Sequence, residues 1–214
     1  MKKFLKSILE DYIKFPLRIL SHPVLAYTEF KEEKKAKMSV AIVMLILASI
    51  VSMIQYVYTG PVLNVNDPTK FNSITTIIYT MCPVIILSVA NWSVTTLMNG
   101  KGKMGEIFKM GCYSYFPVII CGIIGVIASN FVTEDEAMLV TLVYIIGYVL
   151  MAYMIFMGLI CLHEYGIVKT FATVFVTLVA TCVIAFVALL IFDLSQQIYG
   201  FLYSLYNEIV TRFF

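Results

Sequence analysis

Charged residues are scarce in this sequence. Asp, Glu, Lys and Arg make up 13% of its 214 residues, whereas they form about 25% of a typical soluble domain. Hydrophobic residues reach 61%, against about 45–50% in a soluble protein. A soluble fold has too little interior for so much apolar surface, so the composition excludes ordinary soluble classes and indicates an integral membrane protein.

Long apolar stretches account for most of the chain, and no charged side chain lies deep within any of them. A helix of about 20 apolar residues crosses a bilayer, and only helices satisfy every backbone polar group of a single chain segment in lipid. We therefore predict an all-α bundle of five transmembrane helices in a domain of residues 38–192. The predicted spans are residues 38–58, 72–98, 110–131, 137–162 and 170–192. The missing mid-membrane charge argues against a proton-coupled transporter.

Lysine and arginine are unevenly shared between the segments that connect these spans. Nine of the fifteen precede residue 38, three lie in residues 99–109 and one lies in 163–169. The alternate segments hold only two, one in residues 59–71 and one after residue 192. Because cytoplasmic segments carry the excess of positive charge, we predict a cytoplasmic N-terminus and a C-terminus on the outer side.

Both ends of the chain have the residue spacing of amphipathic helices. Residues 1–37 predict a helix on the cytoplasmic membrane surface, interrupted at Pro16 and Pro23. Residues 193–214 predict a second amphipathic helix on the outer side, which either continues the fifth span or lies along the membrane. The apolar stripe of the first contains Leu5, Ile8, Leu9 and Tyr12, and that of the second contains Leu194, Ile198, Phe201, Leu202, Leu205, Ile209 and Phe213.

Patterns of catalysis or metal binding are missing. The five cysteines are scattered through the apolar stretches without a CxxC pair, which indicates packing residues. His163 and Glu164 begin an HExxH pattern, but Ile167 replaces its second histidine, so a metalloprotease is excluded. We interpret His163 as a helix-end residue that caps carbonyls or lies at the headgroup level. We expect no enzyme activity, no cofactor, no metal site and no nucleic-acid partner.

A glycine-rich basic loop, GKGKMG, lies at residues 100–105 between the second and third spans. It fits the GxGxxG pattern, but a dinucleotide site needs a βαβ unit around it. Two interpretations remain open. Lys101, Gly102 and Lys103 could hold an anionic group such as a lipid phosphate at a helix N-terminus. Alternatively, the loop is a flexible turn whose lysines set the topology.

Polar, small and proline residues within the spans form a candidate intramembrane site. Asn91 begins an Asn-Trp-Ser sequon but lies at membrane depth, so we expect a fastener between helices or part of a polar path in place of a glycan. Small residues at intervals of four, including Gly125, indicate that the third span is central. Pro83 and Pro117 predict kinks that form either a crevice or a bent packing surface. Tyr113 belongs to the same candidate site.

Three segments resemble a known family. The run from Trp92 that ends LMNGKGKMGEIFKMGCYSYFP, with its basic loop and Tyr-x-x-x-Pro, resembles the Yip-domain (Ypt/Rab-interacting protein) family. The five-span plan, the HPVLAYTEF segment before the first span and the MGLICLHEYG segment closing the fourth are similar too. No acidic DLYGP-like motif precedes Met38, and Cys112 separates Gly111 from Tyr113. The chain is therefore most similar to the short prokaryotic members, which implies a prokaryotic cell membrane.

These features lead to three functional hypotheses. The first is a non-enzymatic accessory, scaffold or lipid-interacting protein, with membrane lipids, other membrane proteins or a second copy as partners. The alternative is a small transporter or lipid-translocating protein whose path lies between spans two, three and four, near Asn91, Tyr113 and His163. The third, recruitment of a GTPase as in trafficking members, would require the cytoplasmic residues 1–31.

Overall fold

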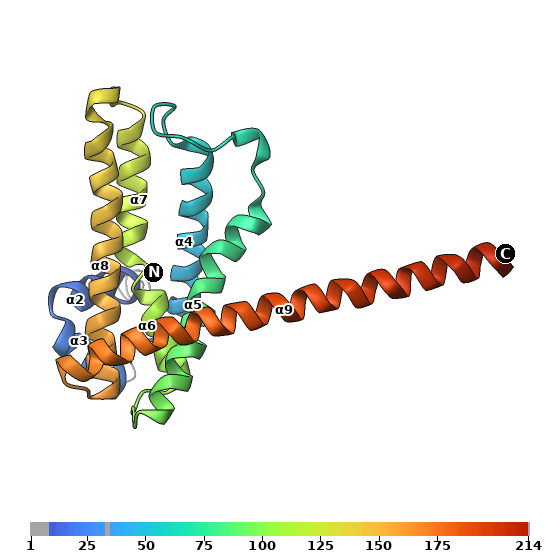
Figure 1. The fold of residues 1–214 in the computed structure, drawn as a ribbon. Coiled ribbons are helices and arrows are strands. Elements are labelled where there is room, and N and C mark those ends of the chain that lie inside the picture. Colours follow the sequence, from blue (N-terminus) through green and yellow to red (C-terminus); the bar gives the residue numbers. More distant parts are fainter. Residues whose placement is uncertain (1–8, 33–34, 214) are drawn as a thin grey trace, which may run out of the picture.

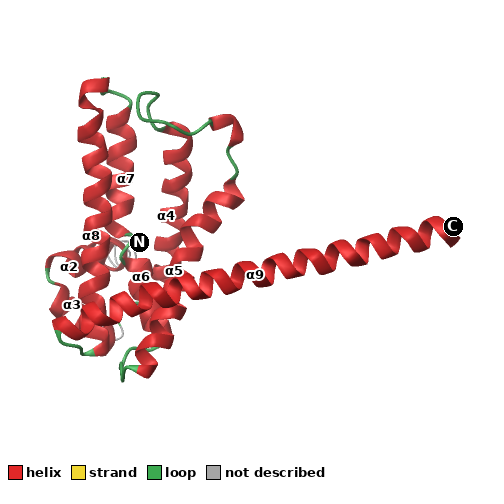
Figure 2. Cartoon of the chain, in the orientation of Figure 1, coloured by secondary structure: helices red, strands yellow, loops and turns green. Residues whose placement is uncertain are grey.

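The computed structural model describes residues 9–32 and 35–213, and within those ranges every regular element is a helix (Figure 2). The all-α prediction is therefore confirmed. The elements are η1 (Glu10–Lys14), α2 (Phe15–Ser21), α3 (Pro23–Glu32), α4 (Met38–Tyr58), η2 (Pro68–Lys70), α5 (Ser73–Leu97), α6 (Met104–Tyr113), α7 (Phe116–Ser129), η3 (Glu134–Glu136), α8 (Ala137–His163) and α9 (Ile167–Phe213).

Five stretches are long and apolar enough to cross a membrane, as predicted. They are Met38–Tyr58, Ser73–Leu97, Met104–Ser129, Glu134–His163 and Ile167–Arg212. The third has the largest buried share of the five, because α6 and α7 together contact α4, α5 and α8. Close helix approach depends on small residues here: a Cβ on Gly147 of α8 would lie 2.9 Å from the Cβ of Cys121 on α7.

The third span is divided into two helices. α6 ends at Tyr113 and α7 begins at Phe116, with Pro117 in its first turn. Proline lacks the N–H that a continuous helix would need, but it fits the first turn of a new helix, where that N–H has no intrahelical partner. The kink predicted at Pro117 is therefore a break. In contrast, α5 continues through Pro83 as one helix.

The N-terminal segment is built into the bundle. Pro23 begins a new helix, α3, after the non-helical His22, whereas the predicted interruption at Pro16 is absent because η1 continues directly into α2. α3 packs against α8 through the buried Tyr27, and the buried Phe30 packs on Tyr113 of α6. The Tyr27 hydroxyl donates to the Met154 carbonyl at 2.9 Å. The segment is therefore more than a surface helix. Residues 1–8, which carry half of its predicted apolar stripe, lie outside the described residues.

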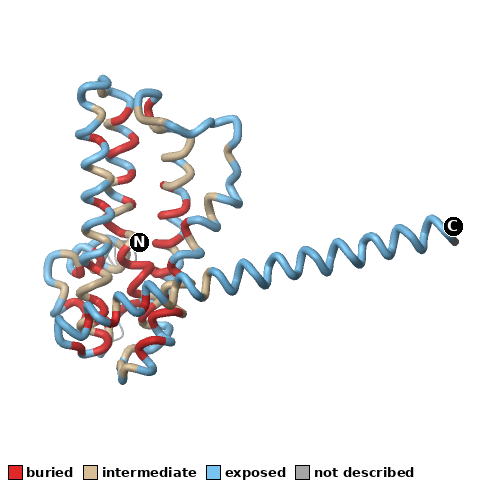
Figure 3. Tube along the Cα trace, in the orientation of Figure 1, coloured by how far each residue is buried: buried red, intermediate tan, exposed pale blue. Residues whose placement is uncertain are grey.

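The last helix, α9, is a single element of 47 residues, about 70 Å long at 1.5 Å per residue. It has no break near residue 193, so the C-terminal amphipathic segment continues the fifth span. Its beginning packs on α5, where Thr170, Thr173 and Thr177 are buried. From residue 178 to residue 212 no side chain is buried, and α9 extends away from α4, α7 and α8 (Figures 1 and 3).

Candidate functional site

Three segments far apart in sequence meet at one end of the bundle, which we call the junction. They are α3, the loop between α5 and α6, and the HEYG turn after α8. The junction residues that contact one another across these segments and the adjoining α5 are Lys31, Asn91, Lys101, Gly102, His163 and Glu164.

A row of hydrogen bonds passes through the buried His163 ring. The Gly102 N–H donates to His163 Nδ1 at 3.2 Å, and His163 Nε2 lies 3.1 Å from Asn91 Oδ1. Because a backbone N–H can only donate, Nδ1 accepts and we assign the ring proton to Nε2. The Asn91 amide then donates to Thr177 Oγ1 at 3.1 Å. Asn91 and His163 therefore fasten α5, α8, α9 and the α5–α6 loop together.

The glycines of the basic loop are needed because it packs on this ring. A Cβ on Gly102 would lie 2.7 Å from His163 Cε1, and one on Gly100 would lie 2.6 Å from His163 Nδ1. The Tyr165 ring stacks on the imidazole with centroids 5.3 Å apart. Residues 100–102 thus form a packed contact, and the Gly102 N–H is already engaged by His163.

Glu164 forms ion pairs that close the junction. It follows the last residue of α8 in a left-handed conformation, φ 55°, which is unfavourable for a residue with a side chain. Its carboxylate lies 2.5 Å from Lys101 Nζ and 2.8 Å from Lys31 Nζ. Lys31 also donates to the Leu162 carbonyl at the end of α8, at 3.0 Å. Hydrogen bonds from Lys101 and Lys31 lower the pKa of Glu164 to about 2.

The two loop lysines do not converge on one point. Lys101 is paired with Glu164, whereas the Lys103 side chain is exposed and makes no hydrogen bond or ion pair with the part of the chain that the structure describes. The Lys103 backbone N–H donates to Glu106 Oε2 at 3.0 Å. Headgroup contact by Lys101, Gly102 and Lys103 stays a prediction, and Lys103 is the member whose charge is free to make it.

The pKa of Glu164 predicts how the junction responds to acid. A carboxyl group whose pKa falls from 4.5 to about 2 on folding stabilises the fold above pH 4.5, and this stabilisation is lost as the pH falls toward 2. The melting temperature of Glu164→Gln should therefore lie below that of the native protein by a constant interval above pH 4.5, and this interval should vanish near pH 2. Thermal unfolding in detergent across this range measures it. Glu208→Gln, which removes only an ion pair within α9, is the control; an interval independent of pH would contradict the assignment.

An apolar cavity of about 360 Å³ lies beside the junction, between α5, α6, α8 and α9. Its polar wall groups are Ser88, Asn91 and Thr177; the remaining lining residues are Leu87, Ile107, Met110, Gly111, Ala152, Ile155, Phe156, Leu159, Val174 and Leu178. Tyr113 lies elsewhere, between Phe15 and Phe30, and its ring centroid is 5.8 Å from that of Phe15 and 5.9 Å from that of Phe30. The structure thus brings Asn91 and His163 together but places Tyr113 on the α2–α3 side.

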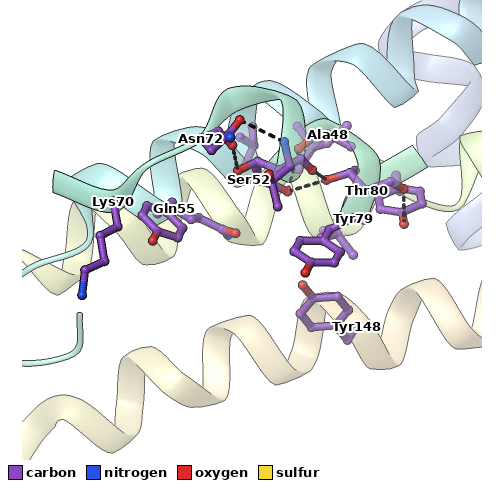
Figure 4. Close-up of a pocket in the computed structure, with 15 residues that line it drawn as sticks. Ala48, Ser52, Gln55, Lys70, Asn72, Tyr79, Thr80 and Tyr148 are labelled. Atoms are coloured by element: carbon purple, nitrogen blue, oxygen red, sulfur yellow. Dashed lines mark hydrogen bonds between the residues drawn. The ribbon is translucent and has the colours of Figure 1, made fainter. Parts of the chain in front are cut away.

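A polar crevice opens at the opposite end of the bundle, and the sequence did not indicate it. It comprises two adjoining hollows of about 550 and 290 Å³, which share Ser52, Gln55, Tyr56 and Tyr148. Figure 4 shows the larger one, with the hydroxyls of Tyr79 on α5 and Tyr148 on α8 pointing toward one another. A signal was available in Gln55, a polar side chain within the first span. Sequence alone does not tell which helices face it.

The break in the third span lies between the two cavities. On the crevice side, the Tyr115 hydroxyl donates to the Thr80 carbonyl at 3.3 Å. On the side of the apolar cavity, Gly111 packs on Val84, where an added Cβ would lie 3.1 Å from Cγ1. The divided helix, which Pro117 begins anew, therefore contributes to both cavities and separates them.

Comparison with models of known protein families shows to which family this chain belongs. The family model of the Yip1 domain matches residues 17–206, nearly the whole chain. The chain belongs to the Yip1 domain family. No curated protein and no solved structure matches it. In this Yip1 domain protein, the segments that carry the resemblance, HPVLAYTEF, the GKGK loop and HEYG, are the three that meet at the junction. The resemblance to the short prokaryotic members stays a prediction.

Proposed function

We propose that this Yip1 domain protein is a non-enzymatic membrane component that acts by holding lipid, as an accessory or scaffold to other membrane proteins. The observation that carries the proposal is the apolar cavity between α5, α6, α8 and α9. Ligand pockets of about 300–1,000 Å³ are mostly apolar with a few placed polar groups, and this cavity has that character. Ala152 and Leu178 line it and are exposed on the outside of the helices, so an acyl chain can enter from the bilayer.

The distribution of charge supports one orientation for this function. The basic N-terminal segment and the lysine-bearing loop both lie at the junction. The excess of Lys and Arg in these segments favours the cytoplasmic side for the junction. The free ammonium of Lys103 then lies where anionic headgroups of the inner leaflet would meet it.

Filling the apolar cavity should displace bound lipid. Ala152→Phe adds a ring to its wall, and we expect the affinity for a long-chain phospholipid to fall about tenfold, equivalent to about 1.4 kcal/mol. Native mass spectrometry of protein released from nanodiscs measures the bound fraction. Ala172→Phe is the matched control, because Ala172 is exposed on α9 and lines neither cavity. Equal lipid occupancy in both variants and the native chain would reject the proposal.

Lipid translocation is the second candidate function, and the divided third span favours it. Discontinuous membrane helices commonly form substrate sites in transporters, with access alternating between their two sides. Here the two cavities lie on opposite sides of the α6–α7 break. Vesicles that contain the purified protein and a labelled phospholipid test it. A transbilayer rate equal to that of protein-free vesicles would reject this function while leaving lipid binding intact.

A further inference from the structure

The polar crevice contains polar groups that the described chain does not satisfy. The Gln55 side-chain amide makes no hydrogen bond within residues 9–32 and 35–213. The Tyr144 hydroxyl is enclosed and makes no hydrogen bond of normal geometry in those ranges, and the side chain that interacts with it there is Thr59. The neighbouring Thr59 hydroxyl already donates to the Gln55 carbonyl at 2.6 Å. Enclosed polar groups are unfavourable without partners, so an occupant that offers hydrogen bonds would stabilise this region.

Two glycines on α7 seat these polar side chains. A Cβ on Gly122 would lie 2.6 Å from Gln55 Nε2, and one on Gly125 would lie 2.4 Å from Tyr144 Cε1. The missing side chains let Gln55 of α4 and Tyr144 of α8 lie against the backbone of α7. Gly125, predicted as a packing residue, therefore positions a crevice wall. The crevice is a preformed feature of the fold.

The chemistry of the walls selects the class of occupant. Among the described residues, the one charged side chain in the lining is Lys70, which lies 3.5 Å from the Asp67 carboxylate, so the site has no strong preference for phosphate. The same described lining includes no carboxylate that would attract an ammonium group. What remains is amide and hydroxyl groups, tyrosine rings and the apolar side chains of Ala48, Val51, Leu63, Val118 and Ile119. Those rings belong to Tyr56, Tyr79, Tyr115, Tyr144 and Tyr148.

We propose that the crevice binds the uncharged, polyhydroxylated headgroup of a membrane amphiphile, a sugar headgroup being the simplest case. Hydroxyl and amide side chains donate to and accept from sugar hydroxyls, and tyrosine rings offer apolar faces with a polar tip. Tyr79 and Tyr148 are exposed at the α5 and α8 edges, so a tail can leave toward the bilayer. This site goes beyond the proposed function, because it lies in a different cavity from the one proposed to hold an acyl chain.

The test uses the full chain in a polyoxyethylene detergent, which contains no sugar. Binding of glucosyl-diacylglycerol, of phosphatidylcholine with the same acyl chains and of free glucose is compared by native mass spectrometry. We expect the glycolipid to bind at least about tenfold more tightly than phosphatidylcholine, and glucose to bind weakly because it lacks the tail. Gln55→Leu and Tyr148→Phe should each reduce glycolipid binding toward the level of phosphatidylcholine. Tyr153→Phe, the same change on the same helix outside both cavities, should leave it unchanged.

Several outcomes would overturn the proposal. Equal binding of the two lipids would show that the headgroup is not recognised. Glycolipid binding that survives Tyr148→Phe and Gln55→Leu would place the lipid elsewhere; if Gln55→Leu fails to fold, Tyr148→Phe decides alone, since it removes only a hydroxyl. Loss of glycolipid selectivity in Ala152→Phe would assign recognition to the apolar cavity. Because Ala152→Phe should reduce phospholipid occupancy and leave glycolipid binding unchanged, the two proposals fail separately.

Discussion

Tyr27→Ala should lower the free energy of unfolding by about 3–5 kcal/mol, the range for removing a large aromatic side chain from a core. Tyr27 is fully buried, and it fills space that Gly158 leaves open on α8. Its loss removes both the packing between α3 and α8 and the hydrogen bond to the Met154 carbonyl. Unfolding in a detergent and SDS series measures the change.

A graded pair of variants separates these two contributions. Tyr27→Phe keeps the ring and loses only the hydrogen bond, so it should destabilise the protein by about 1 kcal/mol. Tyr206→Ala, on the exposed part of α9, removes the same side chain without a tertiary contact and is the control. A value for Tyr27→Ala as small as that of the control would show that α3 is not docked on α8 in the membrane protein.

The docking of α3 also bears on the recruitment of a GTPase by the N-terminal segment. Deletion of residues 1–31 would remove Tyr27 and Phe30, which are buried in the core. Loss of binding after that deletion would therefore not distinguish a recognition segment from a damaged fold. Substitutions at exposed positions such as Leu17 and Leu25 would change the surface of α2 and α3 while keeping the buried contacts.

His163→Leu should lower the free energy of unfolding by about 3 kcal/mol. It leaves Asn91 Oδ1 and the Gly102 N–H without partners, and each buried group left without a hydrogen bond costs about 1–3 kcal/mol. The other histidine, His22, is exposed, so His22→Leu is a matched control.

A double-mutant cycle with Asn91→Leu tests the pairing directly. Replacing both partners leaves fewer orphaned polar groups than the two single changes leave together, so the two single effects should sum to more than the double variant loses. The coupling is measured by the same unfolding series. Additive effects would mean that His163 and Asn91 are stabilised independently, in contradiction to the 3.1 Å contact between them.

Much of the fold follows from the sequence because solvation acts on long uninterrupted stretches. The predicted first span has the bounds of α4, and the second and fourth differ from α5 and α8 by no more than one residue at each end. The third is divided into α6 and α7 and begins earlier than predicted, at Met104. The fifth span continues past residue 192 as the same helix, which is one of the two arrangements predicted, because Asp193 and its polar neighbours are as compatible with helix as the apolar residues before them. Hydropathy marks solubility in lipid and does not mark helix ends.

Tertiary pairings were harder to predict than elements. Nothing in the N-terminal segment indicates that Tyr27 contacts Met154, 127 residues later. Asn91 was predicted as a possible fastener, but its partners His163 and Thr177 could not be named. Residue type thus indicated that a buried partner was needed, and only the packing of helices supplied its identity.

The glycine-rich loop has a packing role that its pattern did not indicate. Its spacing suggested an anion site, which stays a prediction, and the structure adds that the imidazole of His163 lies against Gly100 and Gly102. Gln55 and Tyr144 were overlooked because a single amide or phenol within an apolar span has no periodicity. Both cases depend on a neighbour from another helix.

Because α9 is one unbroken helix that packs on the bundle only near its start, a small rotation there moves its far end by a large distance. Asn91 binds it at Thr177, and a straight helix places residue 212 about 50 Å farther along. Rotation by about 5° at that anchor would sweep the far end through about 4–5 Å. A ligand that rotated α9 at Thr177 would therefore displace the far end of the helix by several ångströms.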